Sequence, residues 1–134
     1  MAEVIVAPSA ALAAVTILRA GLGGMHVGTR VPATRPGRFV TVTQAGGRPP
    51  NMVTAAGLLI VQAWDDDSRM GEFRSHDTAA LCAGLLRESV GATVAGIKVR
   101  WWEQMSDPAW LPDPDTGIPR FQITGELRVA KYAL

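Results

Sequence analysis

The segment Leu58-Leu59-Ile60-Val61-Gln62-Ala63-Trp64 decides the fold, because it is apolar at nearly every position of both alternating sets. A run of this kind is typical of a central β-strand that is covered on both faces. The polar residues Asp65 to Ser68 end the strand, and acidic side chains at this place favour the start of a helix through its N-terminal dipole. A helical stripe then runs from about Gly71 to Ser89, and its apolar members are Ala80, Leu81, Cys82, Leu85 and Leu86.

Another helix is predicted near the N-terminus. Ser9 is a suitable N-cap, and the apolar stripe that follows it ends at the glycine-rich run 21–24. A secretory signal has basic residues before its apolar stretch, whereas Glu3 stands there in this chain and Pro8 interrupts the stretch. We therefore expect a soluble helix and no segment that enters a membrane.

Short β-rich runs lie between this helix and the central strand. They cover Val27–Val31 and Phe39–Gln44, and a loop with Pro32 and Pro36 separates them because proline does not fit a central strand. The segment 45–51, which contains two adjacent glycines and two adjacent prolines, is the strongest turn signal in the chain.

The last third of the chain alternates between apolar and polar residues and predicts two half-buried strands. The first has Ile97, Val99, Trp101 and Met105 on one side, and the second has Phe121, Ile123, Leu127 and Val129 on one side. Together the segments predict one domain over residues 1–134 of class α+β. Its expected architecture is a mostly antiparallel sheet of four to five strands with two helices packed on one face.

Composition excludes several classes of function. The chain has 134 residues with 13 basic and 12 acidic side chains, so its bulk charge is not that of a typical nucleic-acid-binding protein. The single Cys82 excludes an intrachain disulfide and fits a small core residue, and the isolated His26 and His76 offer no metal-ligand spacing. No catalytic motif is present, so we expect a protein that is not an enzyme, with no catalytic residues, no cofactor and no metal.

The charges are distributed unevenly along the chain. Residues 1–63 hold five basic residues and one acidic residue, and the rest of the chain holds eight basic and eleven acidic residues. Such asymmetry suits head-to-tail association, although chance clustering on a solvated surface explains it equally well. The predicted basic face, directed either toward an acidic neighbour or toward DNA, consists of Arg30, Arg35, Arg38 and Arg48.

The segment 106–119 is a second feature, after the uneven charge, that indicates contact with another molecule. It contains four prolines and is too long for a tight hairpin, and loops of this length in a compact domain are usually functional or disordered. We expect Trp110 and Leu111 to anchor a subunit interface, because aromatic residues in rigid exposed loops often do so. The expected interface also includes Asp113, Asp115 and Arg120. The alternative is that Trp110 folds back onto its own sheet.

Three phrases of the sequence support a resemblance to a family. They are Phe39-Val40-Thr41-Val42 followed by Gly46-Gly47, Leu59-Ile60-Val61-Gln62-Ala63-Trp64 before an alanine- and leucine-rich helix, and Leu111-Pro112-Asp113-Pro114-Asp115-Thr116-Gly117-Ile118-Pro119-Arg120-Phe121. In these phrases the chain resembles the tail terminator, or tail completion, proteins of long-tailed double-stranded DNA phages, especially those of actinobacteria. The last phrase carries most of the resemblance.

The resemblance implies a small α/β fold and subunits that form a hexameric ring on the finished tail tube. Such a ring stops polymerisation of the tube and offers the surface on which the DNA-filled head docks. The implied partners are further copies of the chain, the major tail tube protein, a head-side connector protein and DNA that passes through the channel without sequence recognition. The implied location is the virion, at the head–tail interface, after synthesis in the host cytoplasm. Another head–tail connector (a head completion or joining protein) is the alternative, and a small-molecule-binding or enzymatic α+β domain is supported by the fold class alone.

Overall fold

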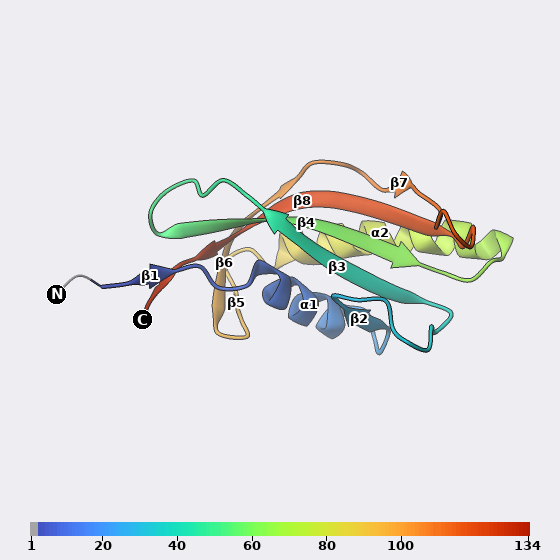
Figure 1. Cartoon of the computed structure of the whole chain (residues 1–134), viewed down its shortest axis with the longest axis horizontal. Coiled ribbons are helices and arrows are strands. Elements are labelled where there is room, and N and C mark those ends of the chain that lie inside the picture. Colours follow the sequence, from blue (N-terminus) through green and yellow to red (C-terminus); the bar gives the residue numbers. More distant parts are fainter. Residues whose placement is uncertain (1–2) are drawn as a thin grey trace.

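A computed structural model describes residues 3–134 of the chain. The elements, in chain order, are β1 (Ile5–Val6), α1 (Ala10–Gly21), β2 (His26–Gly28), β3 (Phe39–Gly46), β4 (Thr54–Trp64), α2 (Arg69–Glu88), β5 (Thr93–Val94), β6 (Ile97–Gln104), β7 (Ala109–Trp110), β8 (Arg120–Ala130) and β9 (Tyr132–Ala133). The pair β1–β9 forms a small separate sheet at one end of the molecule (Figure 1). None of the helices within residues 3–134 is long and apolar enough to cross a membrane.

The fold is α+β, as predicted, but the main sheet is larger than the predicted four to five strands. Within the described residues it has seven strands, in the order β2-β3-β4-β8-β6-β5, with β7 paired to β8. It is also mixed, because β2 runs parallel to β3 while the other pairs are antiparallel. The proline-containing segment 29–38 causes this difference, since it is long enough to bring the chain back to the end of the sheet where β2 begins.

The central strand is β4, which pairs along its whole length with β8 and along most of it with β3. Its residues Leu59 and Val61 are fully buried in the core, where Leu18 of α1 and Leu86 of α2 join them. Leu58 and Ile60, on the opposite side of the strand, are only half-buried. The prediction that this strand is covered on both faces is therefore wrong for one of them.

The two helices begin at serine caps. The Ser9 hydroxyl accepts a hydrogen bond from the Leu12 amide at 3.0 Å, and the Ser68 hydroxyl accepts one from the Gly71 amide at the same distance. Gly57 of β4 lies so close to α1 that a Cβ there would meet the Cβ of Ala10 at 2.6 Å.

The two helices touch each other and reach different parts of the sheet. α1 contacts β2 and β5, which are opposite edges of the sheet, so it runs across the sheet and also touches α2. α2 contacts β4, β6 and β8. Because α1 crosses the sheet, its roughly three helical turns contact strands at both edges.

A β-bulge in β6 changes which tryptophan enters the core. The register of β6 against β8 shifts between Val99 and Trp101, so the alternation predicted for this strand is interrupted. Trp102 is 5% exposed and packs over Gly125, whereas Trp101 is 50% exposed. The prediction that placed Trp101 on the apolar side is wrong. The bulge shifts the alternation by one residue, so Trp102 and not Trp101 faces the core, and the composition of the strand does not reveal such a shift.

Candidate functional site

One end of the sheet collects most of the residues that the sequence singled out. Phe39 at the start of β3, Trp64 at the end of β4 and Arg120 at the start of β8 are neighbours in register. We call this region the loop end and define it as residues 109–120 with Arg35, Arg38, Phe39, Trp64 and Asp65. Figure 1 shows it at the end of the long axis opposite to β1 and β9.

A buried carboxylate organises the loop end. Asp65 is 2% exposed and accepts hydrogen bonds from Arg38 Nε at 3.1 Å and from Arg74 Nη2 at 2.7 Å. The second amino group of Arg38 donates to Thr78 Oγ1 at 3.2 Å, and Arg74 also pairs with Asp66 at 2.9 Å. Asp65 thus joins the segment before β3, the end of β4 and the first turns of α2, and its charge is balanced by two guanidinium groups.

Trp64 is the aromatic centre of the loop end. Its ring stacks on Phe39 with centroids 5.1 Å apart, and its Nε1 donates to Thr41 Oγ1 at 3.1 Å. The guanidinium carbons of Arg120 and Arg35 lie 4.7 and 5.4 Å from the centre of the same ring. These cation–π contacts bring Arg35 and Arg120, two predicted site residues from distant segments of the chain, onto the ring of Trp64.

Backbone hydrogen bonds hold the predicted interface loop in place. The Leu111 amide donates to the Arg120 carbonyl at 2.9 Å, and Arg120 Nε donates to the Leu111 carbonyl at 2.8 Å. Within the loop, the Asp113 amide bonds to Ile118 and the Gly117 amide bonds to Asp113. Gly117 has φ +73°, a left-handed conformation that glycine adopts without strain. The loop is therefore a closed turn fixed to the start of β8.

Asp113 is buried inside this turn. Its carboxylate accepts a hydrogen bond from Thr116 Oγ1 at 2.5 Å and lies 3.8 Å from an Arg35 amino group. The Thr116 hydroxyl, the Asp115 backbone and the nearby arginines hold the pKa of Asp113 below its ordinary value. Asp113 thus fixes the shape of the loop, while the neighbouring Asp115 is exposed.

The two predicted apolar anchors are half-covered by their own subunit. Trp110 is 45% exposed and Leu111 is 43% exposed. The covered part of Trp110 lies against Phe121 at 5.3 Å, and Phe121 in turn meets the edge of His76 at 5.2 Å. The loop therefore leaves part of two apolar side chains uncovered, and the carboxylates of Asp107 and Asp115 in the same segment are exposed.

The four predicted arginines do not form one surface. Arg35 and Arg38 lie in the loop end and are engaged with Asp113 and Asp65. Arg30 is exposed in the 29–38 segment, and Arg48 is exposed in the loop beyond the far end of β3, roughly 25 Å away at about 3.3 Å per residue. Within residues 3–134 neither Arg30 nor Arg48 forms an ion pair.

Charged side chains at the loop end form ion pairs within the subunit. Among the described residues, no group of three or more His, Cys, Asp or Glu side chains has an arrangement that holds a metal ion. The buried Cys82 has its pKa raised to about 12 by desolvation, so the thiolate does not form near neutral pH.

Sequence reasoning missed the buried half of this site. Trp64, Asp65, Arg74 and Thr78 were assigned only to a strand end, a helix start and a helix, although they connect the segments that carry the predicted residues. One signal was available in the sequence, since Asp65 follows a buried strand with no intervening residue. Comparison of the sequence with protein-family models and with curated proteins gives no match.

Proposed function

We propose that this protein is a phage tail terminator that assembles into a ring, most simply a hexamer, on the end of the tail tube. The ring would stop addition of further tube subunits and present a surface to the head-side connector. The proposal rests on the resemblance of the three sequence phrases together with the construction of the loop that carries the third phrase.

The single observation that carries the proposal is the rigid loop with exposed apolar anchors. Its backbone is tied to β8 through Leu111 and Arg120, so little conformational entropy is lost when Trp110 and Leu111 are covered by another molecule. A loop that is fixed on the inside and apolar on the outside is suited to repeated contact between subunits.

The positions of the charges support head-to-tail contact. The first half of the chain supplies α1, β2, β3 and β4, and the second half supplies α2, β8, β6 and β5, which are consecutive on the other side of the β4–β8 pair. The basic and acidic halves of the sequence thus form two sides of the sheet. Contacts that bring a basic part of one copy to an acidic part of the next favour a head-to-tail ring over a head-to-head dimer.

Two arginines are available for the channel or for the tube. Arg30 and Arg48 are exposed and lie in the segments before and after β3. In a ring they would supply spaced positive charges to the phosphates of DNA that passes without sequence recognition. Arg35 and Arg38, by contrast, are held by carboxylates of their own subunit and contribute less charge to a partner.

The test combines the purified protein with the tail tube protein of the same phage. We expect sedimentation equilibrium to show a ring-sized species at high protein concentration, and negative-stain images to show tubes whose ends carry an extra ring and no longer grow. A protein that stays monomeric at every concentration and leaves tube growth unchanged contradicts the proposal. Binding to head-side assemblies without binding to tube ends would instead identify another head–tail connector.

A further inference from the structure

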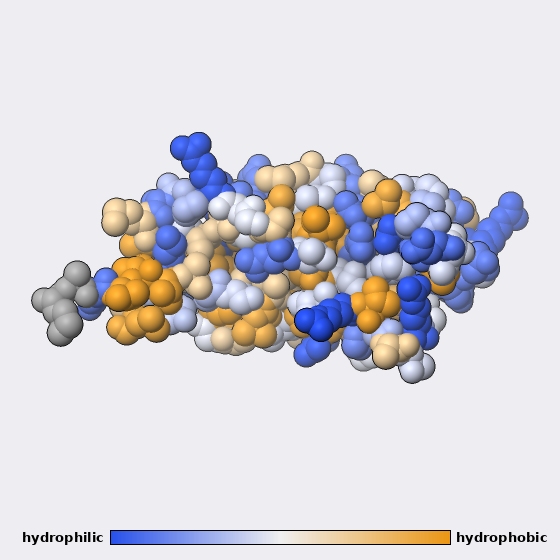
Figure 2. All heavy atoms as spheres, viewed as in Figure 1, coloured by the Kyte–Doolittle hydropathy of each residue, from blue (hydrophilic) through white to orange (hydrophobic). Residues whose placement is uncertain are grey.

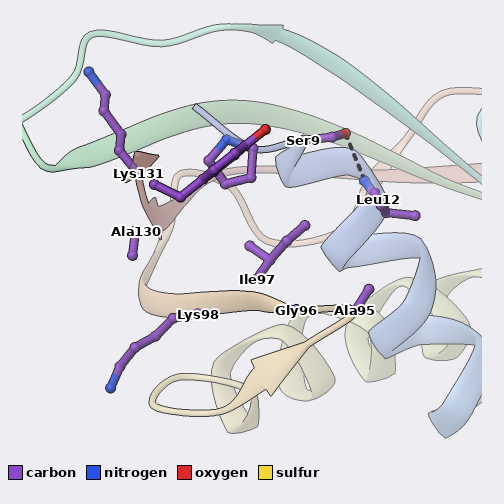
Figure 3. A pocket seen from close by; sticks show the side chains of 10 residues that line it. Ser9, Leu12, Ala95, Gly96, Ile97, Lys98, Ala130 and Lys131 are labelled. Atoms are coloured by element: carbon purple, nitrogen blue, oxygen red, sulfur yellow. Dashed lines mark hydrogen bonds between the residues drawn. The ribbon is translucent and has the colours of Figure 1, made fainter. Parts of the chain in front are cut away.

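A groove lies at the end of the molecule opposite to the loop end. It has a volume of about 440 Å³ and lies between the start of α1, the β5–β6 turn and the β8–β9 junction. Figure 3 shows Ile97 in its floor and Leu12 on the first turn of α1 at its side. Leu12 and Tyr132 are 51% and 50% exposed, so the groove offers apolar surface that its own subunit leaves uncovered.

The charged residues that line the groove are all basic. The chain contains only two lysines, Lys98 and Lys131, and both line the groove. In Figure 3 their side chains extend away from each other, Lys131 upward and Lys98 downward, at the edge of the groove. No acidic residue lines the groove among the described residues, and neither lysine has a carboxylate partner there. An occupant that fits this surface has apolar side chains flanked by negative charges.

The chain itself carries a segment of this description. In residues 107–115 the exposed Trp110 and Leu111 stand between the exposed Asp107 and Asp115, and the segment contains no basic residue. The exposed apolar surface of the groove continues beyond Tyr132 into the β1–β9 pair, where Ile5 is 45% exposed. Figure 2 shows apolar surface gathered at this end of the molecule.

A subunit cannot place this loop in its own groove. Trp110 is paired with Phe121 near the start of β8, and the groove begins at Ala130, the last residue of β8. At about 3.3 Å per residue the two sites lie roughly 30 Å apart along a continuous strand. Any copy of the loop that enters the groove therefore belongs to another molecule, and the contact is heterologous.

We propose that the groove is the receptor for the 107–115 loop of a second copy of this chain. Apolar side chains of the loop contact the exposed Leu12 and Tyr132, and the carboxylates of Asp107 and Asp115 lie near the ammonium groups of Lys98 and Lys131. This inference rests on the proposed ring and names its contact. A flexible peptide of another acidic protein is the competing occupant, which the following experiments distinguish.

Disulfide trapping tests the contact directly. The variant Leu12→Cys with Ala109→Cys places one thiol in the groove and one beside Trp110 while leaving both apolar anchors unchanged. The native Cys82 is buried and its raised pKa of about 12 keeps it out of the reaction. We expect oxidation to give a ladder of linked subunits on a non-reducing gel, because a disulfide forms only where two Cα atoms approach within about 7 Å.

The matched control moves the first thiol to another exposed leucine. Leu81 on α2 is 49% exposed, almost the same as Leu12, so Leu81→Cys with Ala109→Cys has thiols of equal accessibility. We expect no ladder beyond random dimers from this control. Equal ladders from both variants overturn the inference and leave the proposed function intact. So does the absence of a ladder from the groove variant, provided that the unmodified protein sediments as a ring under the same conditions. An unmodified protein that remains monomeric overturns both.

Charge reversal gives an independent test. The variants Lys98→Glu with Lys131→Glu, and Asp107→Lys with Asp115→Lys, should each weaken self-association about tenfold to a hundredfold, since two exposed ion pairs become two repulsive pairs. An equal mixture should recover assembly, because every groove then meets a loop of opposite charge when the variants alternate around an even-numbered ring. A mixture that assembles no better than either variant alone contradicts the inference, and so does a single variant that assembles like the unmodified protein.

Discussion

The double substitution Trp110→Ala with Leu111→Ser should weaken assembly by an amount that follows from the exposed surface. A tryptophan side chain presents up to about 250 Å², so its 45% exposure leaves roughly 110 Å², or about 2.8 kcal/mol at about 25 cal/mol per Å². The exposed part of Leu111 adds roughly 1 kcal/mol. After ordering costs of about 0.5–1.5 kcal/mol, some 2–3 kcal/mol remain for each contact, equivalent to roughly 30- to 150-fold in the dissociation constant.

The same substitution should also lower the stability of the isolated subunit. More than half of Trp110 is already covered, and the contact with Phe121 at 5.3 Å is lost in the alanine variant. We expect a loss of about 2–3 kcal/mol, which lowers the melting temperature of a domain of this size by roughly 6–12 °C. The Leu111→Ser variant alone should weaken assembly by roughly fivefold, which corresponds to about 1 kcal/mol, with a much smaller loss of stability because the bonds between Leu111 and Arg120 are unchanged.

Sedimentation equilibrium well below the melting temperature measures the assembly term separately from folding. The control is Leu81→Ser on α2, which removes a leucine of similar exposure from a surface outside the loop. The reasoning is refuted when the double variant assembles with the dissociation constant of the unmodified protein, or when Leu81→Ser weakens assembly as much as Leu111→Ser does.

Further predictions concern the groups that hold the loop end and the core. Asp65→Asn should destabilise the fold by about 2–3 kcal/mol in urea unfolding, because it leaves two guanidinium groups without their buried partner, and a loss below about 0.5 kcal/mol would contradict this role. Cys82 should react with a thiol reagent only as fast as the protein unfolds, and rapid labelling of the native protein would be inconsistent with its buried position. The pKa of the Asp113 carboxyl is lower in the folded state than in the unfolded state, where it is about 4. The ionised carboxylate therefore stabilises the fold above about pH 4, and this stabilisation is lost as the pH falls through the pKa of the folded state. Thr116→Val should therefore be less stable than the unmodified protein at pH 7, with a difference that shrinks toward pH 3 and that urea titrations at each pH would show.

The central strand and both helices were predictable because their signals are long and periodic. The sequence run at 58–64 belongs to β4, and the cap at Ser9 and the stripe from 71 to 89 correspond to α1 and α2. The strands β1, β5, β7 and β9 have two residues each, too short for any periodic pattern, and form only because a longer strand or another short strand lies beside them. The bulge after Val99 was not predictable for a similar reason, since a single inserted residue leaves no pattern in the sequence. It buries Trp102 in place of Trp101.

The candidate site was predictable at its surface and not in its interior. Trp110 and Leu111 are recognisable from the sequence because apolar residues between prolines have no local core. The contacts that fix them depend on partners far apart in the chain, such as Arg38 with Asp65 across 27 positions and Arg35 with Asp113 across more than that. Which arginine meets which carboxylate is decided by the order of the strands, and that order is not written in any local pattern.

The rigidity of the loop also predicts how the proposed ring forms. A heterologous contact closes into a ring only when it sets the same rotation at every step, about 60° for six copies, and otherwise it gives an open chain. The loop is suited to setting this angle because its backbone bonds to β8 and its internal turn at Asp113 and Gly117 leave it little freedom. Single contacts of about 2–3 kcal/mol are weak, but the last subunit of a ring gains two contacts while losing its freedom only once. A dilution series followed by sedimentation velocity should therefore show monomers and closed rings with few species between them. Open chains that lengthen with concentration would contradict a loop that sets the angle of closure.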